Sequence, residues 1–221
     1  MIKAKDNETG KEAVLEEMCF GVLCLAENAG HLVKCESVLG KQVLHLDAVA
    51  DKGLMKAYWK LDGNAFDDQP APVFMKLDTL VLGGLPVVML LPAGFADPEL
   101  CEDLEATSLD YVPIGFLDLH KIDEGKFTAS GLGIAKPYQG LGLSKYLIYA
   151  GAVIAGIEEL IIPTQLSNSQ AHFAWKHLGS LEVIADNVYH NEPDTVIYKA
   201  KVPQPKELIL KQLVKGLQPG G

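Results

Sequence analysis

The sequence predicts a single domain of the mixed α/β (α+β) class, and three observations support this prediction. The chain has 221 residues, enough for one large domain whose core needs no disulfide or metal. Hydrophobic residues make up 48% of the chain and charged residues 22%, as in ordinary globular proteins. From residue 111 onward, apolar β-prone stretches alternate with helical patterns, which is typical of a sheet covered by helices.

The first 110 residues give a weaker pattern. Residues 12–26 are apolar at mixed spacing and are compatible with a helix. Residues 42–61 fit either a pair of helices or a strand followed by a helix. A cluster of turn-forming residues at 62–70 precedes two predicted strands, at 73–82 and 86–91.

The second half predicts its elements more clearly. Strands at 111–120 and 127–135 flank a hairpin turn, and the second strand is rich in glycine, as expected where a backbone or a ligand comes close. A glycine-containing turn then leads into a helix at 143–155 that is apolar almost all round and should be buried. The remaining predicted elements are a strand at 159–163, a helix at 169–178, strands at 181–184 and 195–202, and an amphipathic helix at 205–217.

The charge of the chain argues against a nucleic-acid partner. Acidic residues number 29 against 19 basic residues, for a net charge of −10, and every basic residue is lysine. Arginine is the usual reader of base edges and a common clamp on phosphates. We therefore expect no nucleic-acid binding, and we expect any bound phosphate to be held by backbone N–H groups or lysine.

The cysteines and the apolar stretches predict a cytoplasmic protein. Cys19, Cys24, Cys35 and Cys101 lie among apolar neighbours at spacings unlike a Cys-x-x-Cys pair, so we expect buried free thiols and no metal site. The N-terminus lacks the apolar core of a signal peptide, and the longest apolar run, residues 80–95, is too short to span a bilayer. We expect no membrane association. The helix at 205–217 should dock on the domain, or else join two copies as a homodimer.

The turn before the helix at 143–155 is the first candidate site. A strand that passes through small residues into a helix leaves backbone N–H groups unpaired at the positive end of the helix dipole, where a phosphate can bind. Taken alone, this turn is equally well explained as a tight strand–helix connection. It lacks the last glycine of a dinucleotide-binding fingerprint, since Lys145 stands there. Its residues are Gln139, Gly140, Leu141, Gly142, Leu143 and Ser144.

Two blocks of the sequence resemble the GNAT superfamily of N-acetyltransferases. Gln139-x-x-Gly142-x-Ser144 is similar to the family's Arg/Gln-x-x-Gly-x-Gly/Ala signature. Asn168-x-x-Ala171-x-x-x-Trp175-x-x-x-Gly179 is similar to its Asn-x-x-Ala-x-x-x-Tyr-x-x-x-Gly block. The resemblance covers roughly residues 113–202, and residues 1–110 show no convincing match.

The resemblance implies a twisted, mostly antiparallel mixed sheet with helices on both faces, which opens into a V where acyl-CoA enters. It implies acetyl transfer from acetyl-CoA, or another acyl-CoA, to a small-molecule or peptide amine. The turn at 139–144 would hold the pyrophosphate through its N–H groups, and the preceding strand would bind the pantetheine arm and polarise the thioester carbonyl. Asn168 would contact the same arm, and Ala171 would leave room for it. The implied cofactor-binding residues are Leu132, Gly133, Ile134, Gln139, Gly140, Leu141, Gly142, Leu143, Ser144, Asn168, Ala171 and Trp175.

The catalytic groups are less well defined. Trp175 stands where the family often has a tyrosine that protonates the leaving thiolate, and an indole N–H is not a proton source. Presenting a lysine-like amine in its neutral form at pH 7 costs about 4.6 kcal/mol, so a base or a water relay is useful. The resemblance points to Thr128 and Ser130 as base positions, and the alternation of the preceding strand places Asp118 and His120 on one face as further candidates.

Three interpretations therefore stay open from the sequence. The first is an amine acyltransferase that uses acyl-CoA. The second is a non-catalytic acyl-CoA-binding protein, which the tryptophan in the second block favours. The third is an α/β scaffold or interaction protein in which the glycine turn only connects a strand to a helix.

Overall fold

The structure, a computed structural model, describes residues 3–5, 12–14, 17–25, 35–66, 80, 83–165, 169–175, 181–186 and 195–201. These residues form an open nine-stranded sheet with the order β10-β11-β9-β8-β7-β6-β3-β5-β4, and a separate two-stranded sheet, β1-β2. The pairing is mostly antiparallel, and the pairs β3–β5 and β8–β9 are parallel. The predicted fold class is confirmed.

The bounds of the elements are as follows. The strands are β1 (Lys3–Lys5), β2 (Glu12–Val14), β3 (Cys19–Cys24), β4 (Ser37–Val38), β5 (Lys41–Asp47), β6 (Gly84–Pro92), β7 (Tyr111–Asp123), β8 (Lys126–Ile134), β9 (Glu159–Gln165), β10 (Leu181–Asp186) and β11 (Thr195–Lys201). The helices are α1 (Lys52–Phe66), α3 (Pro98–Asp103), α4 (Leu143–Ala155) and α5 (Ser169–Trp175), with short 3₁₀ turns η3 (Ala93–Phe95) and η4 (Lys136–Tyr138). No helix in the described part of the chain combines the length and hydropathy that crossing a membrane requires.

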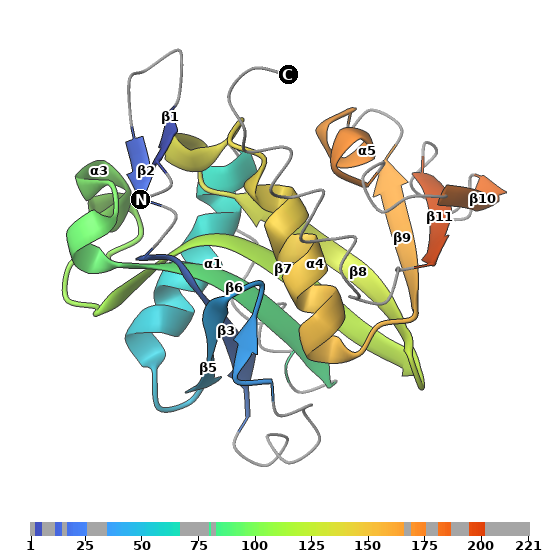
Figure 1. The fold of residues 1–221 in the computed structure, drawn as a ribbon, viewed down its shortest axis with the longest axis horizontal. Helices are drawn as coiled ribbons and strands as arrows, with labels where there is room; N and C mark the ends of the chain where they lie inside the picture. The colour runs from blue at the N-terminus through green and yellow to red at the C-terminus, as the bar shows by residue number, and fades with distance from the viewer. Residues whose placement is uncertain are drawn as a thin grey trace.

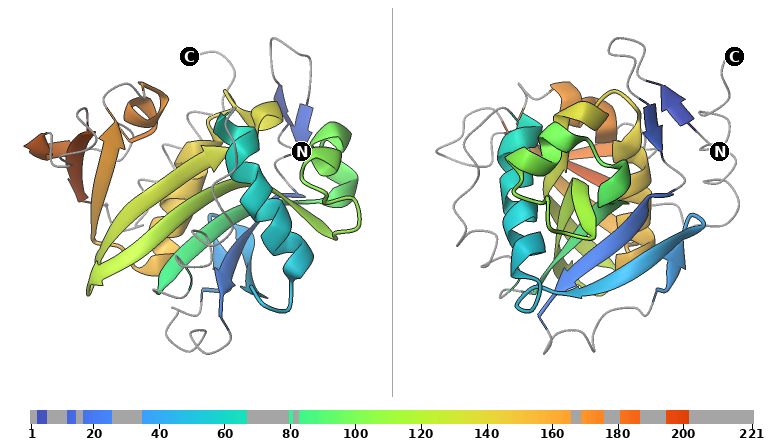
Figure 2. Two further views of the ribbon diagram at one scale, coloured as in Figure 1. Left: turned by 180° about the vertical axis from the view of Figure 1, so that it is seen from behind. Right: turned by 90° about the vertical axis from the view of Figure 1, so that its left-hand side faces the viewer.

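Helices α1 and α4 cover opposite faces of the central strands (Figure 2). Successive residues of β7 face α1 and α4 in turn, as expected for a strand that is buried on both faces. Leu117 faces α4, where a Cβ added to Gly151 would lie 2.6 Å from its Cδ2. Phe116 and Asp118 face α1, where Tyr58 contacts both side chains. The core of the domain therefore lies in two layers, one on each side of the sheet.

Strands β8 and β9 diverge after a short parallel contact. Their pairing covers the first three residues of each strand and ends at Thr128 and Ile161. In β8 the register against β7 shifts at Ser130, which is a β-bulge, and a bulge bends a strand and increases its twist. Figure 1 shows the two strands meeting at one end and separating toward α5. The sheet thus opens into the V that the family resemblance implies.

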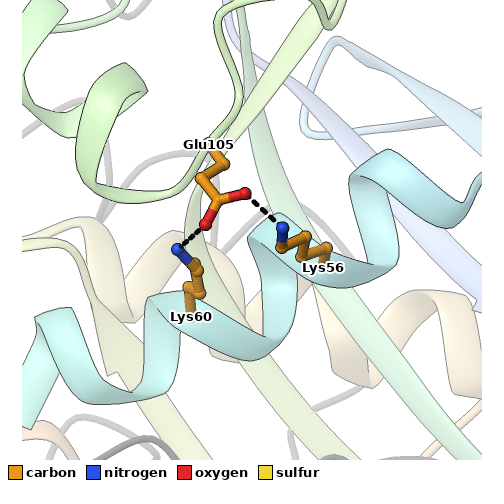
Figure 3. A network of polar contacts seen from close by, with 3 residues as sticks. All are labelled: Lys56, Lys60 and Glu105. Atoms are coloured by element: carbon orange, nitrogen blue, oxygen red, sulfur yellow. Dashed lines mark hydrogen bonds and ion pairs between the residues drawn. The ribbon is translucent and has the colours of Figure 1, made fainter.

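A bridging carboxylate ties α1 to the segment after α3. Glu105 has a left-handed φ of 53°. The N–H of Ala106 donates to the Cys101 carbonyl at 2.7 Å, as in a Schellman helix end. The Glu105 carboxylate contacts Lys56 and Lys60, one turn apart on α1 (Figure 3). Hydrogen bonds from these two lysines lower the pKa of Glu105 to about 2.

The elements predicted between residues 111 and 201 are confirmed as far as the structure describes them, and two expectations for the first part are corrected. Residues 12–26 hold the strands β2 and β3, not a helix. Strand β3 lies between β5 and β6, and all six of its residues are buried. A strand buried on both faces has a continuous apolar run, as a buried helix does, so the sequence pattern does not distinguish the two. Of the two alternatives for residues 42–61, strand then helix is correct. Helix α1 also runs into the predicted turn cluster and ends at Phe66.

Two further predictions cannot be compared with the structure. The strand expected at 73–82 lies outside the described residues except for Leu80, which is helical. The helix expected at 205–217 lies outside them entirely.

Candidate functional site

The turn between β8 and α4 is open to solvent. Gly140 and Gly142 have left-handed φ angles of 77° and 72°, and a Cβ built on either would have no atom within 4 Å. The Lys145 N–H donates to the Gly142 carbonyl at 3.2 Å. Among the described residues, the backbone N–H groups from Gly140 to Ser144 have no hydrogen-bond acceptor. The turn therefore presents unpaired donors at the positive end of the α4 dipole, where an anion binds favourably.

Hydrogen bonds to α1 hold this turn in place. The side-chain amide of Gln139 donates to the Ala65 carbonyl of α1 and to the Ile134 carbonyl of β8, both at 2.9 Å. The Lys136 N–H donates to Asn64 Oδ1 at 3.1 Å. The backbone N–H of Gln139 donates to the Lys136 carbonyl at 3.2 Å. The Gln139 side chain therefore fixes the turn to α1 and β8, and its backbone N–H is already paired. This differs from the resemblance, which implies that the Gln139 N–H helps to hold the pyrophosphate.

Within the described part of the chain, one edge of β8 has no partner strand beyond Thr128. Leu132, Gly133 and Ile134 pair with β7 on one side, whereas the pairing with β9 on the other side ends at Thr128. In a strand, alternate residues direct their N–H and C=O groups to the same edge, and an unpaired edge can bind another extended chain. This edge leads directly to the turn at 140–144.

The two glycines of β8 are explained by packing on the α1 face. A Cβ at Gly133 would lie 2.5 Å from Phe116 Cε1 and 3.0 Å from Ala65 Cβ. A Cβ at Gly131 would lie 3.0 Å from Asp118 Oδ2. The expectation that the glycine-rich strand makes room for a backbone or ligand therefore needs a correction, because side chains of β7 and α1 occupy the space on this face.

The four candidate catalytic residues lie on the paired strands β7 and β8, and Asp118 faces α1. His120 pairs with Thr128 at the point where β8 and β9 separate. The bulge places Ser130 beside Asp118, and the Ser130 hydroxyl donates to the Asp118 carbonyl oxygen at 3.5 Å. Asp118 is 4% exposed, whereas His120 and Thr128 are partly exposed and Ser130 is exposed.

Tyr58 is a further residue beside Asp118 that the sequence analysis did not identify. It is fully buried on α1, and its hydroxyl donates a hydrogen bond to Asp118 Oδ1. Its ring meets Phe116 edge-on, with the centroids 6.0 Å apart. Burial, and then the negative charges of Asp118 and Asp62, raise the pKa of Tyr58 well above its usual value. The only signal in the sequence was a tyrosine among the apolar residues of α1, which by itself indicates a core position.

Helix α5 carries the described part of the second sequence block. Trp175 is 4% exposed and packs in the main core, and Ala171 is half-buried. Asn168 lies outside the described residues. His172 and Tyr198 join α5 to β11 through a contact of 2.9 Å between the Tyr198 hydroxyl and the His172 Nδ1.

The cysteines agree with the prediction in part. All four are free, and Cys19, Cys24 and Cys101 are buried, whereas Cys35 is half-buried. Burial raises the pKa of the Cys19 thiol to about 11, as is typical of an unreactive structural cysteine. In the described ranges no group of three or more His, Cys, Asp or Glu side chains is placed to hold a metal ion.

Solved structures with the same architecture are N-acetyltransferases. The ribosomal-protein-S18-alanine N-acetyltransferase of Escherichia coli aligns at a TM-score of 0.50 and 14% identity, over 70% of this chain and 91% of that one. Ard1 from Thermoplasma volcanium aligns at 0.51 and 12% identity, over 69% and 93% of the two chains. The chain has the GNAT acetyltransferase fold.

A third structure with the GNAT fold, a NatC complex bound to Gag peptide and CoA, aligns at a TM-score of 0.50 and 16% identity, over 72% of this chain and 96% of that one. No protein-family model matches the sequence, and no curated protein matches it significantly. The likeness to these structures is therefore one of fold.

Proposed function

We propose that this chain is an acyl-CoA-dependent N-acyltransferase, which moves an acetyl group from acetyl-CoA to a small-molecule or peptide amine by direct attack. The observation that carries the proposal is the continuity between the free edge of β8 and the turn at 140–144, whose N–H groups are unpaired. The edge can pair with the amides of a pantetheine arm, and the turn can bind a pyrophosphate without a cationic side chain. The GNAT fold supports the same cofactor.

In this proposal, Leu132, Gly133 and Ile134 contact the pantetheine arm and orient the thioester. Preorganised backbone donors of this kind contribute several kcal/mol to an oxyanionic transition state. The open space at Gly140 and Gly142 supports the proposal, because phosphate oxygens need close approach to the backbone.

A non-catalytic acyl-CoA-binding protein is the second candidate. The observation that favours it is Trp175, which is buried and stands where the family often has an acidic tyrosine. Both candidates bind acyl-CoA, so binding tests the cofactor site and turnover separates the two.

Thermal unfolding with and without coenzyme A tests the cofactor site. A ligand that binds only the native state at a hundredfold excess over its Kd stabilises it by about 2.7 kcal/mol, or roughly 5–11 °C for a chain of this size. Coenzyme A and acetyl-CoA should both raise the melting temperature. No change at millimolar concentration would contradict the proposal.

The variant Gly142→Glu places bulk and negative charge in the turn and should abolish the shift caused by coenzyme A. Gly83→Glu is the matched control, since Gly83 has a φ of 79° and also faces open space, but lies in the turn before β6. Both variants introduce the same backbone strain. Gly83→Glu should keep the shift, and equal behaviour of the two variants would refute binding at this turn.

Release of the coenzyme A thiol from acetyl-CoA then tests transfer. The acceptor panel contains aliphatic amines and peptides with a free N-terminus. Turnover with any of them supports the transferase, and stabilisation by coenzyme A without turnover favours the binding protein. The variant Trp175→Tyr, which restores the usual acid, should raise turnover if thiolate protonation limits the rate.

A further inference from the structure

The unpaired edge of β8 has a definite length. The strand has nine residues, and its first three, as far as Thr128, pair with the first three of β9. Six residues, from Ala129 to Ile134, therefore follow without a partner on this edge in the described part of the chain. At the rise of a strand, about 3.3 Å per residue, this edge is about 20 Å long. It begins at the Thr128–Ile161 pair and leads to the turn at 140–144.

The length of a pantetheine arm can be compared with this edge. In the proposed function the pyrophosphate binds at the turn, so the arm runs from Ile134 toward Ala129 and carries the thioester toward the closed end. Pantetheine has about twelve chain bonds between its phosphate oxygen and its sulfur, and a peptide residue has three, so the extended arm is about as long as four residues of strand. About two residues of edge, or about 6.6 Å, therefore remain between the sulfur and the Thr128–Ile161 pair.

The Thr128–Ile161 pair closes the gap between β8 and β9. Paired strands lie about 4.8 Å apart, which leaves no room for a further chain between their backbones. On one face of the sheet the neighbouring pair, Phe127 and Leu160, is buried in the core. On the other face the side chains of Thr128 and Ile161 are partly exposed. The closed end is therefore formed by core residues on one face and by these two side chains on the other.

The two residues of β8 next to this closed end border solvent on one side. Ala129 is buried, whereas the bulged Ser130 is exposed. A chain that passes Ser130 along the edge is therefore not in the core until it reaches the Thr128–Ile161 pair. The length that remains beyond the sulfur is thus available to the acyl group.

We propose that the Thr128–Ile161 pair limits the acyl group of the donor to chains of two to about four carbons. A butyryl group reaches about 4.6 Å beyond the sulfur, and the radius of its methyl group adds about 2 Å, which matches the remaining length. A hexanoyl group needs about 2 Å more and would meet the pair. This inference rests on the proposed function and names the class of its donor, a short-chain acyl-CoA.

Dissociation constants for a series of acyl-CoA esters test the limit without requiring turnover. Acetyl-, propionyl-, butyryl-, hexanoyl- and octanoyl-CoA are titrated into the wild type and followed by calorimetry. The Kd should fall or stay level from acetyl to butyryl and then rise about tenfold from butyryl to hexanoyl. Without a closed end, each further buried methylene would instead tighten binding about fourfold.

Two substitutions of Ile161 should move the limit in opposite directions. Ile161→Ala shortens the side chain at the closed end, so hexanoyl-CoA should bind as tightly as butyryl-CoA. Ile161→Phe lengthens it, so the rise in Kd should occur already at butyryl-CoA. Ile197→Ala is the matched control, because Ile197 is also partly exposed and lies on the same face, opposite Pro163, but in β11, which does not border the gap. It should keep the wild-type limit.

The outcomes separate this inference from the proposed function. A rise in Kd at hexanoyl-CoA that moves in the Ile161 variants and stays in Ile197→Ala supports the inference. A wild-type Kd that rises at no chain length, or a rise that stays at hexanoyl-CoA in folded Ile161 variants, overturns it and leaves the transferase proposal standing. A wild type that binds neither coenzyme A nor any of the esters overturns the proposed function and this inference with it.

Discussion

The substitution Gly133→Ala tests the packing that fixes β8 against α1. The added Cβ would lie 2.5 Å from Phe116 Cε1, 2.8 Å from its Cζ and 3.0 Å from Ala65 Cβ. The Phe116 ring is fully buried and lies edge-on to Tyr58, so it has little room to move. Overpacking costs about 1–3 kcal/mol, and the loss of glycine entropy in the unfolded chain offsets about 0.4–1 kcal/mol of it. The net destabilisation should be about 1–2 kcal/mol.

Urea unfolding and thermal melting measure this effect. For a chain of this size, about 1–2 kcal/mol lowers the melting temperature by roughly 2–8 °C. Gly94→Ala is the control, because its Cβ would have no atom within 4 Å, and its stability should change by less than about 0.5 kcal/mol. The double variant Gly133→Ala, Phe116→Leu should be more stable than the sum of the single changes predicts. If Gly133→Ala is as stable as Gly94→Ala, the described packing is wrong.

Three further changes test other parts of the structure. The Thr164 hydroxyl is buried without a hydrogen-bond partner, so Thr164→Val should be about 1 kcal/mol more stable in urea; equal or lower stability contradicts this. Burial raises the pKa of Cys19 from 9.0 to about 11, so the wild type should lose stability as the pH rises through this range, and Cys19→Ala should lack that contribution to the slope. The pKa of Glu105 falls from 4.5 to about 2, so its ion pairs stabilise the fold above pH 4.5 and fade toward pH 2. Urea midpoints of wild type and Glu105→Gln should therefore differ at pH 7 and converge at pH 2.

The elements after residue 111 could be predicted because their local signals agree with their tertiary roles. Helix α4 begins and ends where predicted, since Gly142 and Gly156 adopt left-handed conformations at its two ends. The hairpin between β7 and β8 turns at Gly125, which has a φ of 67°. In both cases glycine marks a backbone conformation that other residues rarely adopt.

The first part of the chain could not be predicted with the same certainty. Strand β3 is buried on both faces, so its residues lack the alternation that identifies a half-buried strand. Helix α1 passes through Asp62, Gly63 and Asn64, which favour turns. Packing against β7 and β8 outweighs these local preferences, and such packing is not visible in one sequence.

Only the parts of the candidate site that are formed by consecutive residues could be predicted from the sequence. The glycine turn could be found because the residues that form it follow one another along the chain. Tyr58 and Asp118 are 60 residues apart in sequence, and their contact depends on how α1 lies on the sheet. The bulge at Ser130 likewise depends on the register between β7 and β8.

Helix α1 connects the two halves of the site as a rigid spacer. Tyr58 contacts Asp118 near the middle of the helix, and Asn64 and Ala65 in its last turn hold the glycine turn. The separation along the helix axis is therefore set by the helical rise of about 1.5 Å per residue. One inserted residue between Tyr58 and Asn64 would rotate one end by about 100° relative to the other. The number of residues in this stretch thus fixes the distance and the angle between the anion-binding turn and the buried carboxylate.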